Sequence, residues 1–96
     1  MSRRRFLVTY DVSDTKRVKV VHKAMSDFGR HVQFSVFLCD LNGREFLQME
    51  HRLQKILNLR QDQALIFDLG PSQNDRDDQI QSIGRDYDEP AKVFIA

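Results

Sequence analysis

The sequence predicts a small α+β domain in which two helices pack on a sheet. Apolar, β-prone runs recur at residues 6–12, 31–39 and 64–69, and segments with helical periodicity separate them. The resulting order is strand, helix, one or two strands, helix, strand, all within the first 75 residues. This order favours a ferredoxin-like α+β sandwich, β-α-β-β-α-β, with both helices on one face of the sheet. A chain of 96 residues buries only a modest core, so a partner chain is a reasonable expectation.

The first strand is predicted at residues 6–12, where Asp11 interrupts an otherwise apolar run. Ser13 or Asp14 can then cap a helix, because short polar side chains accept hydrogen bonds from the first helical amides. Gly29 is positioned to end this helix. The apolar face of the helix is formed by Val18, Val21, Met25 and Phe28.

Residues 31–39 carry apolar groups on both alternating faces, which predicts either one bent strand or two short strands divided near Ser35. Asn42-Gly43 interrupts the pattern, and an amphipathic helix follows over about 44–58. A further strand is predicted at 64–69, with Gly70-Pro71 stopping it. The apolar positions of the second helix are Phe46, Met49, Leu53, Ile56 and Leu57.

The whole chain, 1–96, is predicted to be one domain with its core in residues 1–70. Residues 71–78 are polar enough for a flexible loop. Residues 79–96 are expected to form a C-terminal strand extension, with a short strand around Ile80 and Ile83 and a terminal strand at 92–95. A terminal strand must pair with a sheet edge, and a neighbouring subunit is one supplier of that edge.

Several classes of function are disfavoured by the composition. Cys39 is the only cysteine, so it cannot form an internal disulfide and is interpreted as a core residue in a cytoplasmic protein. The three histidines do not have the spacing of zinc ligands, and neither a nucleophilic triad nor a phosphate-cradling glycine loop is visible. No apolar stretch is long enough for a membrane span, and no membrane partner is expected.

The charge is unevenly distributed along the chain. Residues 1–60 hold twelve Lys/Arg and six acids, whereas residues 61–96 hold three bases and eight acids. On the first predicted helix, Lys16, Lys19 and Lys23 form a basic stripe opposite the apolar face. A basic surface of this kind suggests binding to a polyanion, and the plainer alternative is that the charges only solvate the helix.

Acids next to bases suggest a site for Mg²⁺, which binds one or two carboxylates together with water and phosphate oxygens. Asp14 is interpreted mainly as a helix cap. Asp11 is interpreted either as a metal ligand or as a structural hydrogen-bond acceptor. In a two-fold dimer whose first strands end near the axis, two copies of Asp11 could share one cation.

Two motifs, in this order along the chain, link it to a known family. The first is Tyr10-Asp11-Val-Ser-Asp14 with Arg17 following, and the second, after Phe28-Gly29, is Val32-Gln33-x-Ser35-Val36-Phe37. From residue 5 to its end, the chain resembles the small CRISPR-associated proteins of the spacer-acquisition machinery, which are named endoribonucleases.

This resemblance implies a ferredoxin-like homodimer in which the sheets face each other and each C-terminal strand is exchanged onto the partner's sheet. It also implies that Asp11 binds a shared Mg²⁺ ion needed to cleave RNA or DNA phosphodiesters. Tyr10 and Arg17 would assist as catalytic residues. A second implied role is architectural, with the dimer lying between pairs of the CRISPR integrase and holding a DNA duplex. The basic stripe, with Arg30, would then contact phosphates.

Two hypotheses follow: a magnesium-dependent endonuclease, and a non-catalytic scaffold that only binds spacer DNA. A third is a ferredoxin-like regulatory module with no nucleic-acid role. Loss of cleavage with retained duplex binding in an Asp11→Asn variant would favour the first. Nucleic-acid binding that survives charge reversal of the basic stripe would favour the third.

Overall fold

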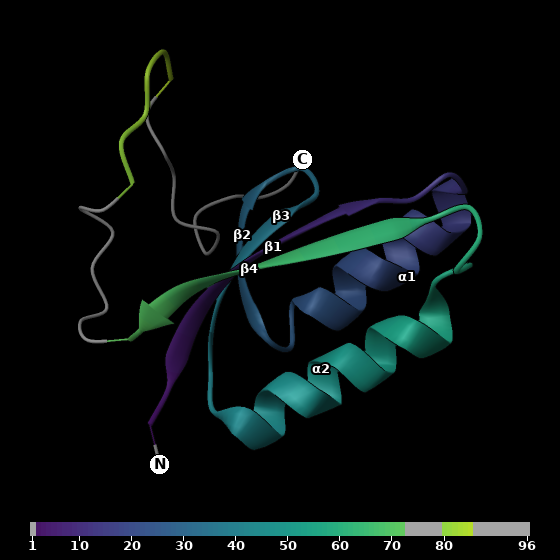
Figure 1. Cartoon of the computed structure of the whole chain (residues 1–96). Helices are drawn as coiled ribbons and strands as arrows, with labels where there is room; N and C mark the ends of the chain where they lie inside the picture. Colours follow the sequence, from purple (N-terminus) through teal and green to yellow (C-terminus); the bar gives the residue numbers. More distant parts are fainter. Residues whose placement is uncertain (1, 73–79, 86–96) are drawn as a thin grey trace.

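The computed structural model describes residues 2–72 and 80–85, and its elements follow the predicted order. The strands lie in the order β2-β3-β1-β4, every neighbouring pair is antiparallel, and both helices cover one face of the sheet (Figure 1). The predicted ferredoxin-like sandwich is therefore confirmed. The elements are β1 (Arg4–Asp11), α1 (Thr15–Met25), β2 (Gly29–Gln33), β3 (Val36–Leu41), α2 (Gly43–Ile56) and β4 (Gln63–Pro71).

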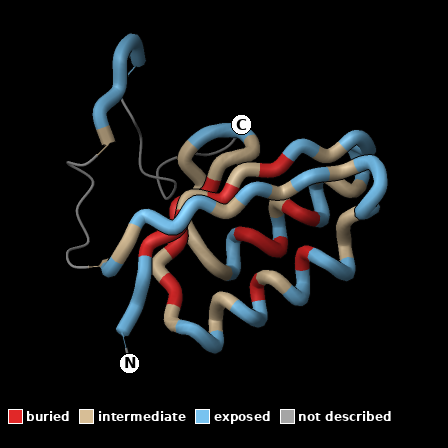
Figure 2. Tube along the Cα trace, viewed as in Figure 1, coloured by how far each residue is buried: buried red, intermediate tan, exposed pale blue. Residues whose placement is uncertain are grey.

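The core lies between the sheet and the two helices, as the buried segments in Figure 2 show. Successive side chains of a strand point to opposite faces, so alternate residues of β1 face the helices. Cys39 is part of this core, and burial raises the pKa of its thiol to about 12, which confirms its interpretation as a core residue. The buried cluster comprises Phe6, Val8, Tyr10, Val21, Met25, Phe37, Cys39, Leu41, Met49 and Leu53.

The end of α1 differs from the prediction. The helix stops at Met25, a turn spans residues 26–28, and Gly29 is the first residue of β2. A Cβ atom at Gly29 would lie 2.5 Å from the Cys39 Sγ and 2.5 Å from the Leu38 carbonyl oxygen. The expectation that Gly29 ends the helix is therefore wrong: the glycine allows the edge strand to approach β3 closely.

The middle of the chain forms two strands, because residues 34 and 35 make the turn between β2 and β3. This settles the choice left open by the sequence. Asn42 then caps α2 through a reciprocal pair of hydrogen bonds: its side chain accepts from the Glu45 amide at 2.8 Å, and the Glu45 side chain accepts from the Asn42 amide at 2.9 Å.

The C-terminal elements depart most from expectation. β4 continues past Leu69 to Pro71, because Gly70 adopts a φ of +98° and a register shift lies opposite, between Arg4 and Phe6. The prediction that Gly70-Pro71 stops the strand is therefore wrong.

Residues 80–85 contain no strand, so the predicted strand around Ile80 and Ile83 is also wrong; the Ile83 side chain is almost fully exposed. The predicted strand at 92–95 and residues 73–78 of the predicted loop lie outside the described residues. In the part of the chain that is described, neither helix has the length and apolar character needed to cross a membrane.

Candidate functional site

Asp11 is the last residue of β1, and its side chain is exposed. It pairs with Gln63, the first residue of β4, at the end of the β1–β4 ladder. Among residues 2–72 and 80–85, no hydrogen bond or ion pair reaches its carboxylate. The alternative that Asp11 is a structural acceptor therefore finds no donor in the described residues, and the carboxylate is accessible to a cation or to a partner chain.

Asp14 has the structural role that the sequence favoured. Its backbone is extended, and its Oδ2 accepts a hydrogen bond of 2.9 Å from the Arg17 amide, which caps α1. A carboxylate at this position also faces the positive end of the helix dipole. The carboxylate is therefore accounted for by the fold, and no metal ion is needed to explain it.

Tyr10 precedes Asp11 but faces the other side of the sheet. Its ring is in the core and stacks with Phe37, and its hydroxyl lies 3.4 Å from the His22 Nδ1. Burial raises the pKa of Tyr10. The structure therefore does not bring the Tyr10 hydroxyl and the Asp11 carboxylate together, although sequence analysis placed both in one catalytic set.

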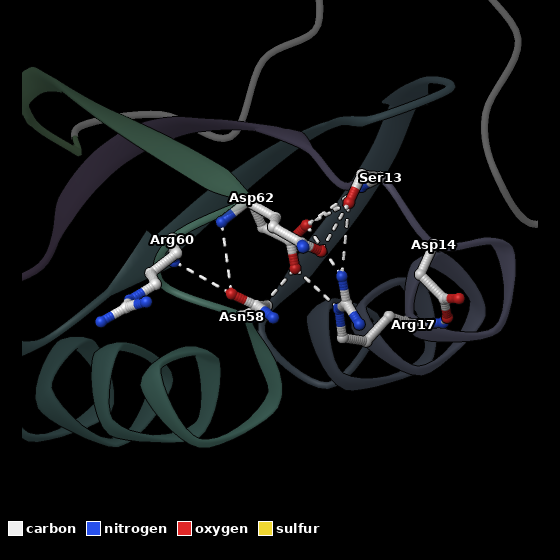
Figure 3. A network of polar contacts seen from close by, with 7 residues as sticks. Ser13, Asp14, Arg17, Asn58, Arg60 and Asp62 are labelled. Atoms are coloured by element: carbon white, nitrogen blue, oxygen red, sulfur yellow. Dashed lines mark hydrogen bonds and ion pairs between the residues drawn. The ribbon is translucent and has the colours of Figure 1, made fainter.

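Arg17 is held by an acid that sequence analysis did not identify. The Asp62 carboxylate accepts from the Arg17 Nε at 2.7 Å and Nη2 at 3.1 Å, and the Asp62 side chain has no solvent-exposed surface (Figure 3). It also accepts from the Ser13 amide at 3.0 Å, the Ser13 hydroxyl at 3.2 Å and the Asn58 amide at 2.9 Å. The hydrogen bond from Arg17 is the main reason that the pKa of Asp62 lies far below its usual range.

The role of Asp62 was not predicted because its hydrogen-bond partners are distant in sequence. Arg17 and Ser13 lie 45 and 49 residues away, so no local periodicity reports the contact. The available signal was weak: Asn58 and Asp62 bracket a polar connection between a helix and a strand. Asn58 organises that connection by accepting from the Arg60 and Gln61 amides (Figure 3).

Lys16, Lys19 and Lys23 are all exposed on α1, on the side opposite its buried residues. They form the basic stripe that the sequence predicted. Arg30 is half-buried on β2, opposite Leu38, and strand alternation places it on the sheet face away from the helices. The structure therefore separates Arg30 from the basic stripe.

The sheet face away from the helices carries exposed apolar side chains on β4. Leu65, Phe67 and Leu69 are 45%, 48% and 54% exposed, while Ala64 and Ile66, on the opposite face of the strand, pack against the core. Leu7 of β1 pairs with Phe67 and continues this apolar face inward. We call the residues Leu7, Leu65, Phe67 and Leu69 the open sheet face.

The family comparison matches most of the chain. The model of the family described as "CRISPR associated protein Cas2" matches residues 4–77. A curated protein of Geobacter sulfurreducens, named CRISPR-associated endoribonuclease Cas2, is 36% identical over 86% of this chain and 86% of its own length. One from Rhodospirillum rubrum, CRISPR-associated endoribonuclease Cas2 1, is 36% identical over 86% of this chain and 80% of its own length.

Solved structures agree with this match. The crystal structure of Streptococcus pyogenes Cas2 has a TM-score of 0.72 at 33% identity, covering 83% of this chain and 99% of that chain. Another crystal structure described as Cas2 has a TM-score of 0.73 at 28% identity and covers 99% of both chains. The similarity thus extends across the sheet and both helices.

Proposed function

Because the chain belongs to the CRISPR-associated Cas2 family, we propose that it is a magnesium-dependent endonuclease of spacer acquisition that cleaves RNA or DNA phosphodiesters. The observation that carries the proposal is the exposed Asp11 carboxylate at the end of β1, with no protein donor among the described residues. The family resemblance points to the same residue. We place this activity in the cytoplasm, because a lone thiol, Cys39, fits a reducing compartment.

A single Asp11 is a sparse metal site. Within the described residues no three metal-ligating side chains gather, so one chain offers one carboxylate. Mg²⁺ is commonly held by one or two carboxylates, with water and phosphate oxygens completing the shell. The donor set therefore fits Mg²⁺ when two chains meet and each contributes Asp11, which makes the homodimer part of the proposed site.

The open sheet face supports such a dimer. The helices leave one face of the sheet uncovered (Figure 1), and strand alternation places the exposed leucines and phenylalanine of β4 on that face. Apolar patches of this kind on small proteins commonly mark interaction surfaces. Alternation along β1 places Asp11 on the same side as Leu7 and Thr9. Pairing through this face would bring two Asp11 residues together if the two-fold axis passes near the end of β1.

In the proposed reaction, Asp11 would hold the cation, and the basic stripe on the outer side of α1 would attract the nucleic-acid backbone by charge. A bound Mg²⁺ ion would supply an acidified water and neutralise charge developing on the attacked phosphate. Tyr10 and Arg17, the other catalytic residues that the resemblance implies, would act from these positions: the Tyr10 hydroxyl lies 3.4 Å from the His22 Nδ1, and Arg17 donates to Asp62.

The test is an Asp11→Asn variant compared with Asp14→Asn. Asn caps helices as well as Asp does, so Asp14→Asn removes the same charge three residues away and keeps the cap. We expect Mg²⁺-dependent cleavage to fall at least about a hundredfold in Asp11→Asn, since metal and electrostatic terms are of that size, and to persist in Asp14→Asn. Equal cleavage by Asp11→Asn and wild type would assign the activity to a contaminant.

A second candidate function, a scaffold that binds spacer DNA beside the CRISPR integrase, is favoured by the basic stripe. The three lysines are exposed and recur at intervals of three and four residues along α1. Reversing them to Glu should weaken duplex binding and flatten its salt dependence, whereas the same reversal at Arg44 and Lys55 on α2 serves as the control. Binding that persists in an inactive Asp11→Asn variant would show that this role is separable from cleavage.

A further inference from the structure

Asp62 joins two connections that lie next to the proposed site. One is the segment between β1 and α1, which contains Ser13, and the other is the segment between α2 and β4, which contains Asn58. The Asp62 carboxylate accepts hydrogen bonds from both segments and from Arg17 of α1 (Figure 3). Five donor atoms therefore converge on one side chain.

The hydrogen bonds of Asp62 lie close to Asp11 in the sequence of both β1 and β4. Ser13, whose amide and hydroxyl donate to Asp62, lies two residues after Asp11. Gln63, which follows Asp62, is the strand partner of Asp11. The backbone at Asp11 is thus fixed on one side by the β1–β4 ladder and on the other by the Asp62 carboxylate.

We propose that Asp62 is a positioning residue for Asp11, acting through Ser13 and Arg17. This inference rests on the proposed function, because it assigns Asp62 a role in the geometry of that site. Asp62 has no exposed side-chain surface and does not reach substrate or metal itself. The proposal also gives Arg17 a role besides the catalytic one expected from the resemblance: its Nε and Nη2 donate to Asp62, so it stabilises the support of Asp11.

Replacing the carboxylate should loosen the segment after β1 without unfolding the chain. Asp62→Asn keeps the shape, but its amide nitrogen cannot accept from the donors that now meet a carboxylate oxygen. Misplacement of a reacting group by about 1 Å can cost on the order of a hundredfold in rate. The expected result is therefore a kcat reduced by about tenfold or more, with an unchanged KM for nucleic acid.

The experiment compares wild type, Asp62→Asn and Asp27→Asn at a temperature at which thermal unfolding shows each to be folded. Asp27 is the matched control, because it also pairs with an arginine, Arg52 at 2.6 Å, but is exposed and lies at the other end of α1. The readouts are kcat, KM, the Mg²⁺ concentration for half-maximal rate, and hydrogen exchange of the Ser13 amide.

In Asp62→Asn we expect a lower kcat, a higher Mg²⁺ requirement and faster exchange at Ser13, with no such changes in Asp27→Asn. Should Asp62→Asn not fold, Arg17→Lys takes its place, because it keeps the charge but loses the two-pronged donor. Folded variants with wild-type kcat and Mg²⁺ requirement would overturn the positioning role. Asp11→Asn is assayed alongside: its retained cleavage would contradict the proposed function, and its inactivity combined with a fully active Asp62→Asn would contradict this inference alone.

Discussion

His22 is a histidine whose protonated form the fold disfavours. It is half-buried, its ring meets His31 edge-on with centroids 4.5 Å apart, and its Nδ1 lies 3.4 Å from the Tyr10 hydroxyl. Burial is the main reason, and the neighbouring His31 a further one, that the pKa of His22 is lowered from its usual 6.5. The folded protein therefore binds a proton at His22 less readily than the unfolded chain does.

This lowered pKa predicts a loss of stability on mild acidification. The unfolded state takes up the proton first, so the contribution of neutral His22 is complete above pH 6.5 and is lost as the pH falls below it. Chemical unfolding between pH 7.5 and 5 should show a smaller loss in His22→Gln than in wild type. His51→Gln, at an exposed position on α2, is the control and should follow wild type. Parallel pH profiles for wild type and His22→Gln would refute the prediction.

At the scale of residues, the sequence predicted interactions between residues that lie close together in the chain. The cap at Asp14 could be predicted because donor and acceptor lie three residues apart. The burial of Cys39 followed from its apolar neighbours. Asp62 and its pairing with Arg17 could not be predicted, because the two residues lie 45 positions apart in the sequence.

At the scale of elements, α2 owes its start to the capping box at Asn42. The two reciprocal hydrogen bonds with Glu45 satisfy amides that the helix leaves unpaired. Asn42→Ala should lower the free energy of unfolding by about 1 kcal/mol. Denaturant unfolding measures this, with Gln48→Ala on the exposed side of α2 as the control. An Asn42→Ala variant as stable as the control would contradict the assigned cap.

The sequence predicted an element boundary well where a nearby side chain sets it. The prediction was poorer where contact with another strand sets the boundary. The start of α2 was placed within one residue. Gly29 was assigned to a helix end because glycine commonly ends helices, yet its role is set by Cys39, a residue of the neighbouring strand. Likewise β4 extends through Gly70-Pro71 because Arg4 of the neighbouring strand β1 pairs with Pro71, a residue 67 positions away in the sequence.

At the scale of the molecule, the open sheet face should control association. Phe67→Asp places a charge at the centre of this face and should raise the dimer dissociation constant about tenfold or more, the effect of losing a central interface residue. Leu47→Asp is the control, because Leu47 is similarly exposed but lies on α2. Sedimentation equilibrium measures the change. Equal association of the two variants would exclude this face as the dimer surface.

The fold of the whole molecule was predictable because strand and helix periodicities alternate in an order with few topological solutions. The site was only partly predictable. Asp11 was recognised as a charge at the end of an apolar strand, but Tyr10 and Arg30 were grouped with partners that strand alternation places on other surfaces. Alternation along β1 separates Tyr10 from Asp11, whereas the position of Arg30 relative to α1 depends on how the sheet and the helix pack.

The most direct test of the central claim, that two Asp11 carboxylates hold one ion, is the stoichiometry of Mg²⁺ binding measured by titration calorimetry on the dimer. We predict one ion for every two chains in wild type and in Asp14→Asn, and no binding at this site in Asp11→Asn. One ion per chain, or unchanged binding in Asp11→Asn, would contradict the shared site.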